Sequence, residues 1–195
     1  GTDVQGQLGC ANIANMKFND MDDEFKRSYP RILVGLKDLI IKEVCCGNEH
    51  SLAVTIEGNV YAWGNNSYKQ LGIGYNSPAF VNQPTRVYNV GSVVKVSSGY
   101  EHSVALTEAG ELYSWGHGEG GLLGHGELED QAVPKMIIEF KKKNLTVTKV
   151  SCGGLHNLAI AGDGEVFTWG RGEGGQLGLS KKSLESLERL DCGIS

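Results

Sequence analysis

The sequence lacks any hydrophobic run of the length that a membrane span requires. A transmembrane helix needs about 20 consecutive, mostly apolar residues, and polar or charged residues interrupt every apolar stretch of this chain well before that length. No basic segment followed by an apolar core opens the chain, so a secretory signal peptide is not indicated. We therefore expect a protein that does not insert into a membrane.

The chain also lacks an excess of basic residues. Its 18 Lys and Arg stand against 23 Asp and Glu, which gives a formal net charge of -5. A protein that grips the phosphate backbone of a nucleic acid presents a basic face. The short lysine run at 141–143 is too small to supply such a face. Direct nucleic-acid binding is therefore not expected.

Cysteine is present without a recognisable pattern. The five cysteines are an odd number, and none are spaced as Cys-x-x-Cys, so neither a disulfide framework nor a zinc site is indicated. Cys46, Ser98 and Cys152 share one place in the repeat described below. We interpret that place as a small, half-buried position where thiol and hydroxyl are interchangeable. This use of cysteine favours a reducing compartment, cytoplasmic or nuclear.

Motifs of familiar enzyme chemistry are missing as well. The sequence has no Gly-x-Ser-x-Gly and no His-Glu-x-x-His. Its glycine-rich stretches at 116–121 and 171–175 lack the Gly-Lys-Ser/Thr of a phosphate loop. Ser51 and Ser103 each follow a histidine, but neighbours along a strand point to opposite faces, so no nucleophile–base pair is predicted. We expect no enzyme activity and no cofactor.

Three copies of one pattern occupy most of the chain. An aliphatic residue and two small residues lead into Gly-x-x-His and alternating aliphatics, at 44–54, 96–106 and 150–160. An aromatic-x-Trp-Gly follows, with the Trp 13 residues after the His each time. The Trp-to-Trp steps are 52 and 54 residues. A period this regular indicates a repeat architecture.

Each repeat has the composition of several short strands. In the middle copy, 93–98, 102–107 and 112–115 are rich in β-branched and aromatic residues. The third copy places Asp163-Gly164 between two such runs, a hairpin signal. After each Trp-Gly a Gly- or Asn-rich loop closes on Leu-Gly, and a Pro-containing apolar run follows at 83–87 and 133–138. About four strands per repeat predict the blade of a β-propeller.

The repeats divide the chain into segments. Residues 1–9 match the end of a repeat, because Gly1 corresponds to the Gly of Trp-Gly, and we expect a piece of a longer array. The segments are 1–9, the repeats 10–72, 73–124 and 125–178, and the tail 179–195. The tail fits either a short amphipathic helix over 183–190 or a diverged strand that begins another blade. We expect an all-β, incomplete ring of about three and a half four-stranded blades.

The first repeat is about ten residues longer than the others. The excess lies in 16–29, which includes an acidic run. Such additions usually map to loops on one face, so we interpret this segment as a surface insertion.

One histidine per repeat raises the question of a metal. A metal site would need further Cys, His or carboxylate ligands at short spacing, and none occur there. The identical position in each copy favours a structural role, a hydrogen bond to a loop or to a neighbouring blade. The recurring tryptophan is assigned to the core. The residues with these structural roles are His50, His102, His156, Trp63, Trp115 and Trp169, and no metal is expected.

These motifs resemble the regulator of chromosome condensation repeat family. The resemblance covers 1–178, and copy three departs from the pattern only in placing Asn157 after its histidine. It implies a β-propeller, usually of seven blades. Since repeat proteins are stabilised by contacts between neighbours, an incomplete ring implies marginal stability, self-association through its open blade edges, or a fragment isolated from a full ring.

Two functional hypotheses follow from this resemblance. The first is a non-catalytic protein–protein interaction module whose blade loops bind a partner, since family members dock partners within larger proteins such as ubiquitin ligases. The alternative is a guanine-nucleotide exchange factor for a Ran-type small GTPase, with Glu101, Glu119 and Asp130 as candidates. The full set of candidate contact residues is Asp20, Asp22, Asp23, Glu24, Tyr75, Phe80, Glu101, Glu119, Glu127 and Asp130.

Overall fold

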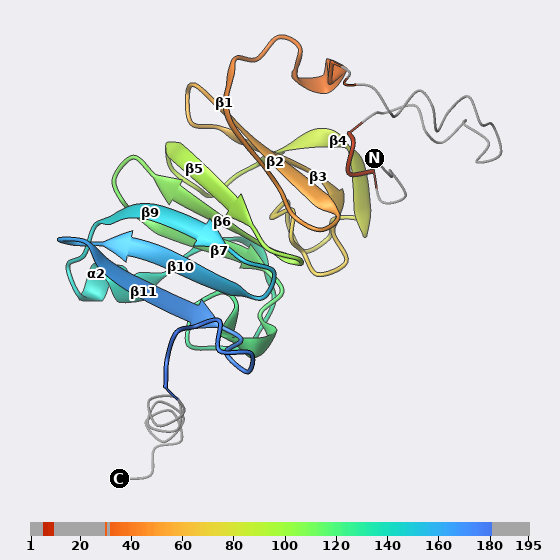
Figure 1. The fold of residues 1–195 in the computed structure, drawn as a ribbon. Helices are drawn as coiled ribbons and strands as arrows, with labels where there is room; N and C mark the ends of the chain where they lie inside the picture. The colour runs from red at the N-terminus through yellow and green to blue at the C-terminus, as the bar shows by residue number, and fades with distance from the viewer. Residues whose placement is uncertain (1–5, 10–29, 31, 181–195) are drawn as a thin grey trace.

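The computed structural model describes residues 6–9, 30 and 32–180 of the chain. Its strands form three antiparallel sheets that follow one another along the sequence (Figure 1). Blade 1 contains β1 (Ile41–Cys46), β2 (His50–Thr55), β3 (Val60–Asn65) and β4 (Phe80–Val87). Blade 2 contains β5 (Val93–Ser98), β6 (His102–Thr107), β7 (Leu112–Gly116) and β8 (Gln131–Met136). Blade 3 contains β9 (Val147–Cys152), β10 (His156–Ala161) and β11 (Glu165–Gly170).

Within each blade the strand order follows the chain order, so every blade is a meander of hairpins. The β2–β3 and β6–β7 turns place Gly58 and Gly110 at the same position, with φ of 83° and 76°. A Cβ atom on Gly58 would lie 2.8 Å from the backbone nitrogen of Val93 in the next blade. Glycine is therefore required twice over, by the positive φ and by the close approach of the neighbouring blade.

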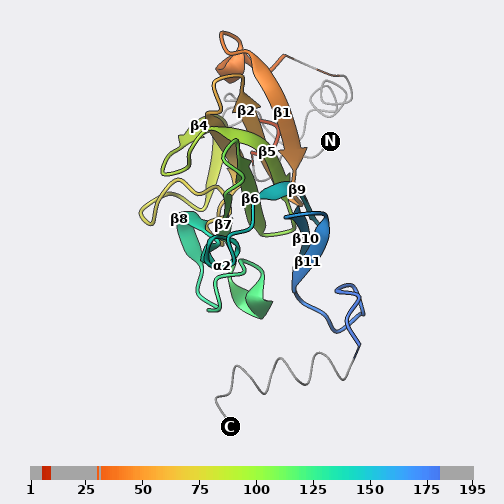
Figure 2. The same cartoon turned by 90° about the vertical axis from the view of Figure 1, so that its left-hand side faces the viewer.

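The core lies between blades rather than inside any single sheet. Figure 2 shows the sheets stacked beside one another, and β5, the first strand of blade 2, contacts both β1 and β9. One apolar cluster joins Leu52 of blade 1 to Val96 and Trp115 of blade 2. A second joins Val104 of blade 2 to Ala159 of blade 3. Strands β2 and β6 are buried along their whole length. Neighbouring blades cover both faces of β6, whereas β2 has blade 2 on one face and the segment around Leu36 on the other.

The fold-class prediction is confirmed by the four-stranded antiparallel sheets of blades 1 and 2. Blade 3 has three strands within the described residues. The expected insertion over 16–29 and the tail segment 183–190 lie outside those residues. The repeat boundaries remain predictions.

The apolar run 133–138 is not one strand as expected. Strand β8 ends at Met136, and the short helix α2 (Ile138–Lys142) begins two residues later. The helix buries Phe140, whose ring centroid lies 5.2 Å from that of Phe167 and 6.1 Å from that of Trp169. Packing against blade 3 therefore turns the end of this run into a helix. Within the described residues, no helix is long and apolar enough to cross a membrane.

One hydrogen-bonding pattern recurs at each boundary between blades. The backbone carbonyl of the residue before Leu-Gly accepts two hydrogen bonds from the next blade. One comes from the side chain of the residue after the repeat His, and the other comes from the indole N–H of the repeat Trp. The carbonyl of Gln7 binds Ser51 Oγ (3.0 Å) and Trp63 Nε1 (2.8 Å). The carbonyl of Gln70 binds Ser103 Oγ (2.8 Å) and Trp115 Nε1 (2.9 Å). The carbonyl of Leu122 binds Asn157 Nδ2 (2.9 Å) and Trp169 Nε1 (3.2 Å).

The repeat histidines make a second set of bonds across these boundaries. His50 Nε2 lies 2.9 Å from Ser103 Oγ, and His102 Nε2 lies 2.8 Å from Asn157 Oδ1. Ser103 and Asn157 thus contact both the histidine and the loop carbonyl of the preceding blade. Blade-to-blade packing is therefore fixed by directional bonds as well as by apolar burial.

Candidate functional site

One face of the three blades carries the long loops in which the repeat copies differ. Each loop begins after the third strand of a blade, on the same side as the turn between the first two strands. Backbone hydrogen bonds join each loop to that turn: Asn65 N to Glu49 O (2.8 Å), His117 N to Glu101 O (2.9 Å) and Arg171 N to Leu155 O (2.9 Å). We call this surface the loop face; its segments are 47–49, 66–79, 99–101, 117–130, 153–155 and 171–180.

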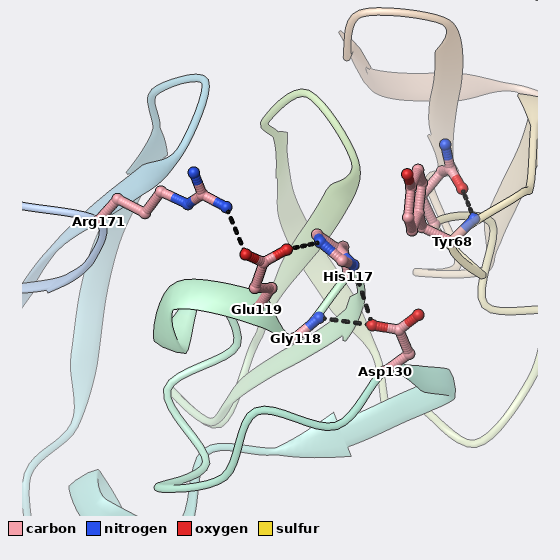
Figure 3. A network of polar contacts seen from close by, with 7 residues as sticks. Tyr68, His117, Gly118, Glu119, Asp130 and Arg171 are labelled. Atoms are coloured by element: carbon pink, nitrogen blue, oxygen red, sulfur yellow. Dashed lines mark hydrogen bonds and ion pairs between the residues drawn. The ribbon is translucent and has the colours of Figure 1, made fainter.

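His117 lies at the centre of a polar network on the loop face (Figure 3). Its Nδ1 is 3.0 Å from Asp130 Oδ1, and its Nε2 is 3.2 Å from Glu119 Oε2. The other carboxylate oxygen of Glu119 is 3.0 Å from an Arg171 guanidinium nitrogen in blade 3. From blade 1, the Tyr68 ring lies over the imidazole at 4.4 Å between centroids, tilted by 57°. The network therefore links loops from all three blades.

The local backbone holds this network in place. Asp130 Oδ1 also accepts the backbone N–H of Gly118 at 2.9 Å. A Cβ atom at Gly118 would lie 2.2 Å from the carbonyl oxygen of Glu129, so only glycine lets the two ends of the loop meet. Ionised carboxylates only accept hydrogen bonds, so both ring nitrogens of His117 are satisfied when each carries a proton.

The network presents its carboxylates outward. The His117 side chain is 15% exposed, whereas those of Glu119 and Asp130 are 64% and 43% exposed. The histidine is thus a half-buried support, and its two acidic partners remain accessible to a binding protein.

Exposed aromatic residues also lie on the loop face or at its edge. Tyr75 and Phe80 lie at the end of the blade 1 loop and are exposed, as is Tyr100 in the β5–β6 turn. Tyr100 donates its backbone N–H to Gly154 O at 2.9 Å, and a Cβ atom at Gly154 would lie 2.6 Å from the tyrosine ring. Tyr100 therefore packs across the boundary to blade 3. Tyrosine is enriched among the residues that dominate protein–protein binding energy.

A hollow of about 370 Å³ opens among the three glycine turns of this face, lined by Cys46, Ser98 and Cys152. Burial raises the pKa of Cys152 to about 12 and that of neighbouring Cys45 also to about 12. These thiols stay protonated, so they are poor nucleophiles and poor metal ligands. Within the described residues, no three or more His, Cys, Asp or Glu side chains are grouped to hold a metal ion.

The loop face contains the predicted contact residues Tyr75, Glu101, Glu119, Glu127 and Asp130, whereas Phe80 is the first residue of β4, directly after the loop segment 66–79. Glu119 and Asp130 meet at His117, and Glu101 contributes its carbonyl oxygen there. Glu127 is instead paired with Lys135, whose hydrogen bond lowers the pKa of this carboxyl. The remaining predicted residues, Asp20, Asp22, Asp23 and Glu24, lie outside the described residues.

Sequence reasoning missed His117, Arg171 and Tyr68 as site residues. Asn65, His117 and Arg171 occupy the same position, directly after Trp-Gly, in successive repeats. The Trp-Gly before it is the same in all three copies, but this position is amide, imidazole and guanidinium in turn. That variation at a fixed, loop-facing position was the available signal.

Stacked antiparallel sheets, each with one Gly-x-x-His turn and one Trp-Gly strand, define a β-propeller built from repeats of a single type. A family profile described as "RCC1-like domain" matches residues 1–191. The chain belongs to the RCC1-like domain family.

Individual relatives agree with this assignment. The chain is 36% identical over 149 residues to the ultraviolet-B receptor UVR8 of Arabidopsis thaliana, covering 76% of this chain and 33% of the receptor. It is 34% identical over 205 residues to the probable E3 ubiquitin-protein ligase HERC6 of Homo sapiens, covering 100% of this chain and 19% of the ligase. The chain therefore spans a third or less of the length of these two relatives.

Solved structures of the yeast RCC1 protein Prp20 are also similar. Prp20 bound to Kap60 matches with a TM-score of 0.74 and 26% identity, over 94% of this chain and 41% of Prp20. Prp20p from Saccharomyces cerevisiae, described with its binding properties to Gsp1p and histones, matches with a TM-score of 0.58 and 26% identity, over 81% of this chain and 36% of Prp20p.

Proposed function

We propose that this chain is a non-catalytic protein-interaction module that binds a partner with a basic surface through its loop face. The network around His117 is the observation that carries the proposal. It ties Tyr68 of blade 1, Glu119 and Asp130 of blade 2, and Arg171 of blade 3 into one ordered surface. A surface ordered before binding loses less entropy when a partner docks.

The charge of the loop face favours a basic partner. Its described segments carry the carboxylates Glu49, Glu101, Glu119, Glu127, Glu129, Asp130 and Glu173. The lysine and arginine of the same segments are Lys69 and Arg171, and both are engaged. Lys69 Nζ donates to the Tyr75 carbonyl at 3.2 Å, and Arg171 pairs with Glu119. The surface offered to a partner is therefore acidic and aromatic. Its negative charge attracts a basic partner, and its exposed tyrosines can supply apolar contacts to that partner.

The comparisons support a protein partner in general terms. Prp20 is solved in complex with Kap60, and Prp20p is described as binding Gsp1p and histones. For this chain such partners are part of the proposal, as is a cytoplasmic or nuclear location. The free thiols Cys45, Cys46 and Cys152 support a reducing compartment.

The test uses purified core histones as a basic probe. Glu119→Gln combined with Asp130→Asn should weaken binding by about tenfold or more. Basic side chains of the partner would then be buried at the interface without the carboxylates that pair with them. The matched control is Glu57→Gln with Glu108→Gln, which removes two exposed carboxylates from turns at the opposite ends of the strands. Equal weakening by both pairs of substitutions would contradict a role for the loop face.

Guanine-nucleotide exchange on a Ran-type GTPase is a second candidate. It is favoured by the placement of Glu101, Glu119 and Asp130 around one histidine. The measurement is release of a fluorescent GDP analogue from the GTPase in the presence of the chain. Release above the spontaneous rate, abolished by Glu119→Gln with Asp130→Asn and retained by the control pair, would favour exchange over simple docking.

A further inference from the structure

Ser77 is the one serine or threonine in this sequence that a proline follows directly. Pro78 comes next to it, and the other three prolines follow Tyr29, Gln83 and Val133. A protein kinase whose substrate groove offers no acceptor for the N–H of the next residue favours proline there, because proline has no N–H to leave unpaired. The chain therefore contains a single acceptor of the type that proline-directed kinases use.

The acceptor lies in the middle of a short loop segment that is held at both ends. At one end, the Gly74 N–H donates to the Ala132 carbonyl of blade 2 at 2.9 Å. At the other end, Phe80 begins β4 and pairs with β3. The segment 75–79 between these anchors is exposed except for Ser77, which is half-buried. A kinase can therefore approach the segment from solvent.

The hydroxyl of Ser77 holds this segment closed. Its Oγ donates to the Gly74 carbonyl at 2.5 Å and accepts a hydrogen bond from the buried Asn66 Nδ2 at 2.7 Å. The same Nδ2 donates to the Pro78 carbonyl at 2.8 Å. These bonds all join residues of one loop, and the aromatic side chains at its end are exposed. Lifting Ser77 out of the loop therefore removes little apolar burial and costs less free energy than opening a strand.

A lysine ammonium lies beside the same residue. Lys69 Nζ donates to the Tyr75 carbonyl at 3.2 Å and to the Ser77 carbonyl at 3.4 Å. Within the part of the chain that the structure describes, no carboxylate forms an ion pair with Lys69. Its positive charge is thus met by neutral carbonyls, and a phosphate on Ser77 would bring an anion to it. Hydrogen bonds between an ammonium and a phosphate are stronger than those to a carbonyl.

We propose that Ser77 is a phosphorylation site for a proline-directed protein kinase, and that Lys69 and Asn66 bind the phosphate. The Ser77 Oγ forms a bond to the γ-phosphorus of ATP, the bond from that phosphorus to the β,γ-bridging oxygen breaks, and ADP leaves. The hydroxyl proton passes to the catalytic carboxylate of the kinase. The esterified oxygen no longer donates to the Gly74 carbonyl, so the contacts of Lys69 and Asn66 with the phosphate replace the bonds that closed the loop.

The modification adds about 1.5 to 2 negative charges to the loop face at pH 7. A more acidic face would bind a basic partner more strongly, a consequence that rests on the proposed function. The site itself rests on the contacts of Ser77, Asn66 and Lys69. Its test uses neither histones nor a GTPase, so its failure and the failure of the proposed function are distinguishable.

The first measurement is phosphorylation of the whole folded chain by a purified mitogen-activated protein kinase with ATP. Mass spectrometry should find one phosphate, on Ser77, and Ser77→Ala should abolish it. Pro78→Ala should slow incorporation by about tenfold or more, because alanine brings an unpaired N–H into the kinase groove. The matched control is Pro84→Ala, which removes a proline that follows Gln83 in β4 and should leave the rate unchanged.

A synthetic peptide of residues 71–84 serves as the reference substrate. If the kinase modifies the peptide but not the folded chain, the loop is closed to the enzyme and the proposal is overturned. Failure of both substrates overturns it as well, since the sequence around Ser77 is then not recognised. Phosphate found on another residue in place of Ser77 has the same meaning.

The second measurement asks whether Lys69 holds the phosphate. Phosphorus NMR of the modified chain between pH 8 and 5 follows the protonation of the phosphate. The neighbouring ammonium stabilises the dianion, so the midpoint should lie about half a pH unit lower than in modified Lys69→Gln. The control is modified Lys149→Gln, which removes an exposed lysine of β9 and should match the unsubstituted chain. Equal midpoints with and without Lys69 would overturn the proposed phosphate site.

Discussion

His102 donates its Nε2–H to Oδ1 of Asn157, a residue in the next blade 2.8 Å away. The direction is fixed, because the Asn157 amide gives its own hydrogen to the Leu122 carbonyl at 2.9 Å and leaves the amide oxygen as acceptor. His50 is fixed in the same way, since the Ser103 hydroxyl gives its one proton to the Gln70 carbonyl. Both histidines are therefore Nε2–H tautomers, and their buried Nδ1 atoms have no partner among the described residues.

The stability of the chain should fall as pH falls through the range where histidine normally titrates. Burial lowers the pKa of His50 to about 3 and that of His102 to about 4, whereas an imidazole in the unfolded chain has a pKa of about 6.5. Below pH 6.5 the unfolded chain therefore binds protons that the folded chain does not. The free energy of unfolding decreases with falling pH, by about 1.4 kcal/mol per pH unit for each histidine.

Urea unfolding, followed by circular dichroism at several pH values between 7.5 and 5, would measure how the free energy of unfolding depends on pH. This interval lies above the range in which most carboxylates titrate. The control is His102→Gln, which removes one of the two fully buried histidines. The free energy of unfolding of this variant should depend less steeply on pH. A free energy of unfolding that does not change over this interval would show that the histidines are not held neutral.

Asn157 and Ser103 should be partly interchangeable. Asn157 is fully buried and serves both His102 and the Leu122 carbonyl, and Ser103 serves the equivalent pair one boundary earlier. Asn157→Ala leaves the buried Nε2–H of His102 unpaired and removes one of the two hydrogen bonds of the Leu122 carbonyl, which keeps the bond from Trp169. It should therefore cost about 1–3 kcal/mol of unfolding free energy. Asn157→Ser should cost about 1 kcal/mol or less. Chemical denaturation of the two variants at pH 7.5 checks this, and equal losses would argue against the shared role.

The strands themselves could be predicted from the sequence. Periodic β-branched and aromatic residues placed strands at 93–98, 102–107 and 112–115, and the structure has β5, β6 and β7 there with one residue added. These positions are set by local pattern and by turn glycines, which a sequence displays directly.

The contacts between blades could not be read in the same way. The sequence places Ser103 beside His102, its neighbour in the chain, and predicts no nucleophile–base pair between these two residues. The actual partner of Ser103 is His50, 53 positions away, in the preceding blade. Whether His50 meets Ser103 depends on how the sheet of blade 1 is shifted relative to the sheet of blade 2. The sequence of a single repeat does not contain that information. The His117 network was missed for the same reason, since its members come from three blades.

A comparison of two glycines should isolate the contribution of the close contact between the x-Leu-Gly glycine and the tryptophan indole of the next blade. Gly72 and Gly121 have nearly equal φ values of 69° and 70°. A Cβ at Gly72 would lie 2.7 Å from Trp115 Nε1, whereas nothing lies within 4 Å of the equivalent point at Gly121. Gly121→Ala should cost about 1–2 kcal/mol from backbone strain alone. Gly72→Ala should cost at least about 1 kcal/mol more, because the buried indole must move. Thermal and urea unfolding of both variants measure the difference, and equal losses would exclude steric contact as the reason for glycine at this position.

The thiols at one repeat position should differ sharply in reactivity. Cys46 is exposed in the β1–β2 region, whereas Cys152, at the same place two repeats later, is half-buried and has its pKa raised by burial to about 12. A thiol with that pKa has about one thiolate in ten thousand molecules at pH 8, and the thiolate is the form that reacts. Iodoacetamide should therefore modify Cys46 well before Cys152 or Cys45, as followed peptide by peptide in the mass spectrum. Cys46→Ser should remove the fast phase among these three sites, in a chain where Cys10 and Cys192 are also Ser. Rapid modification of Cys152 in that folded variant would contradict this prediction. It would mean that β9 becomes exposed to solvent often enough for the Cys152 thiol to ionise and react.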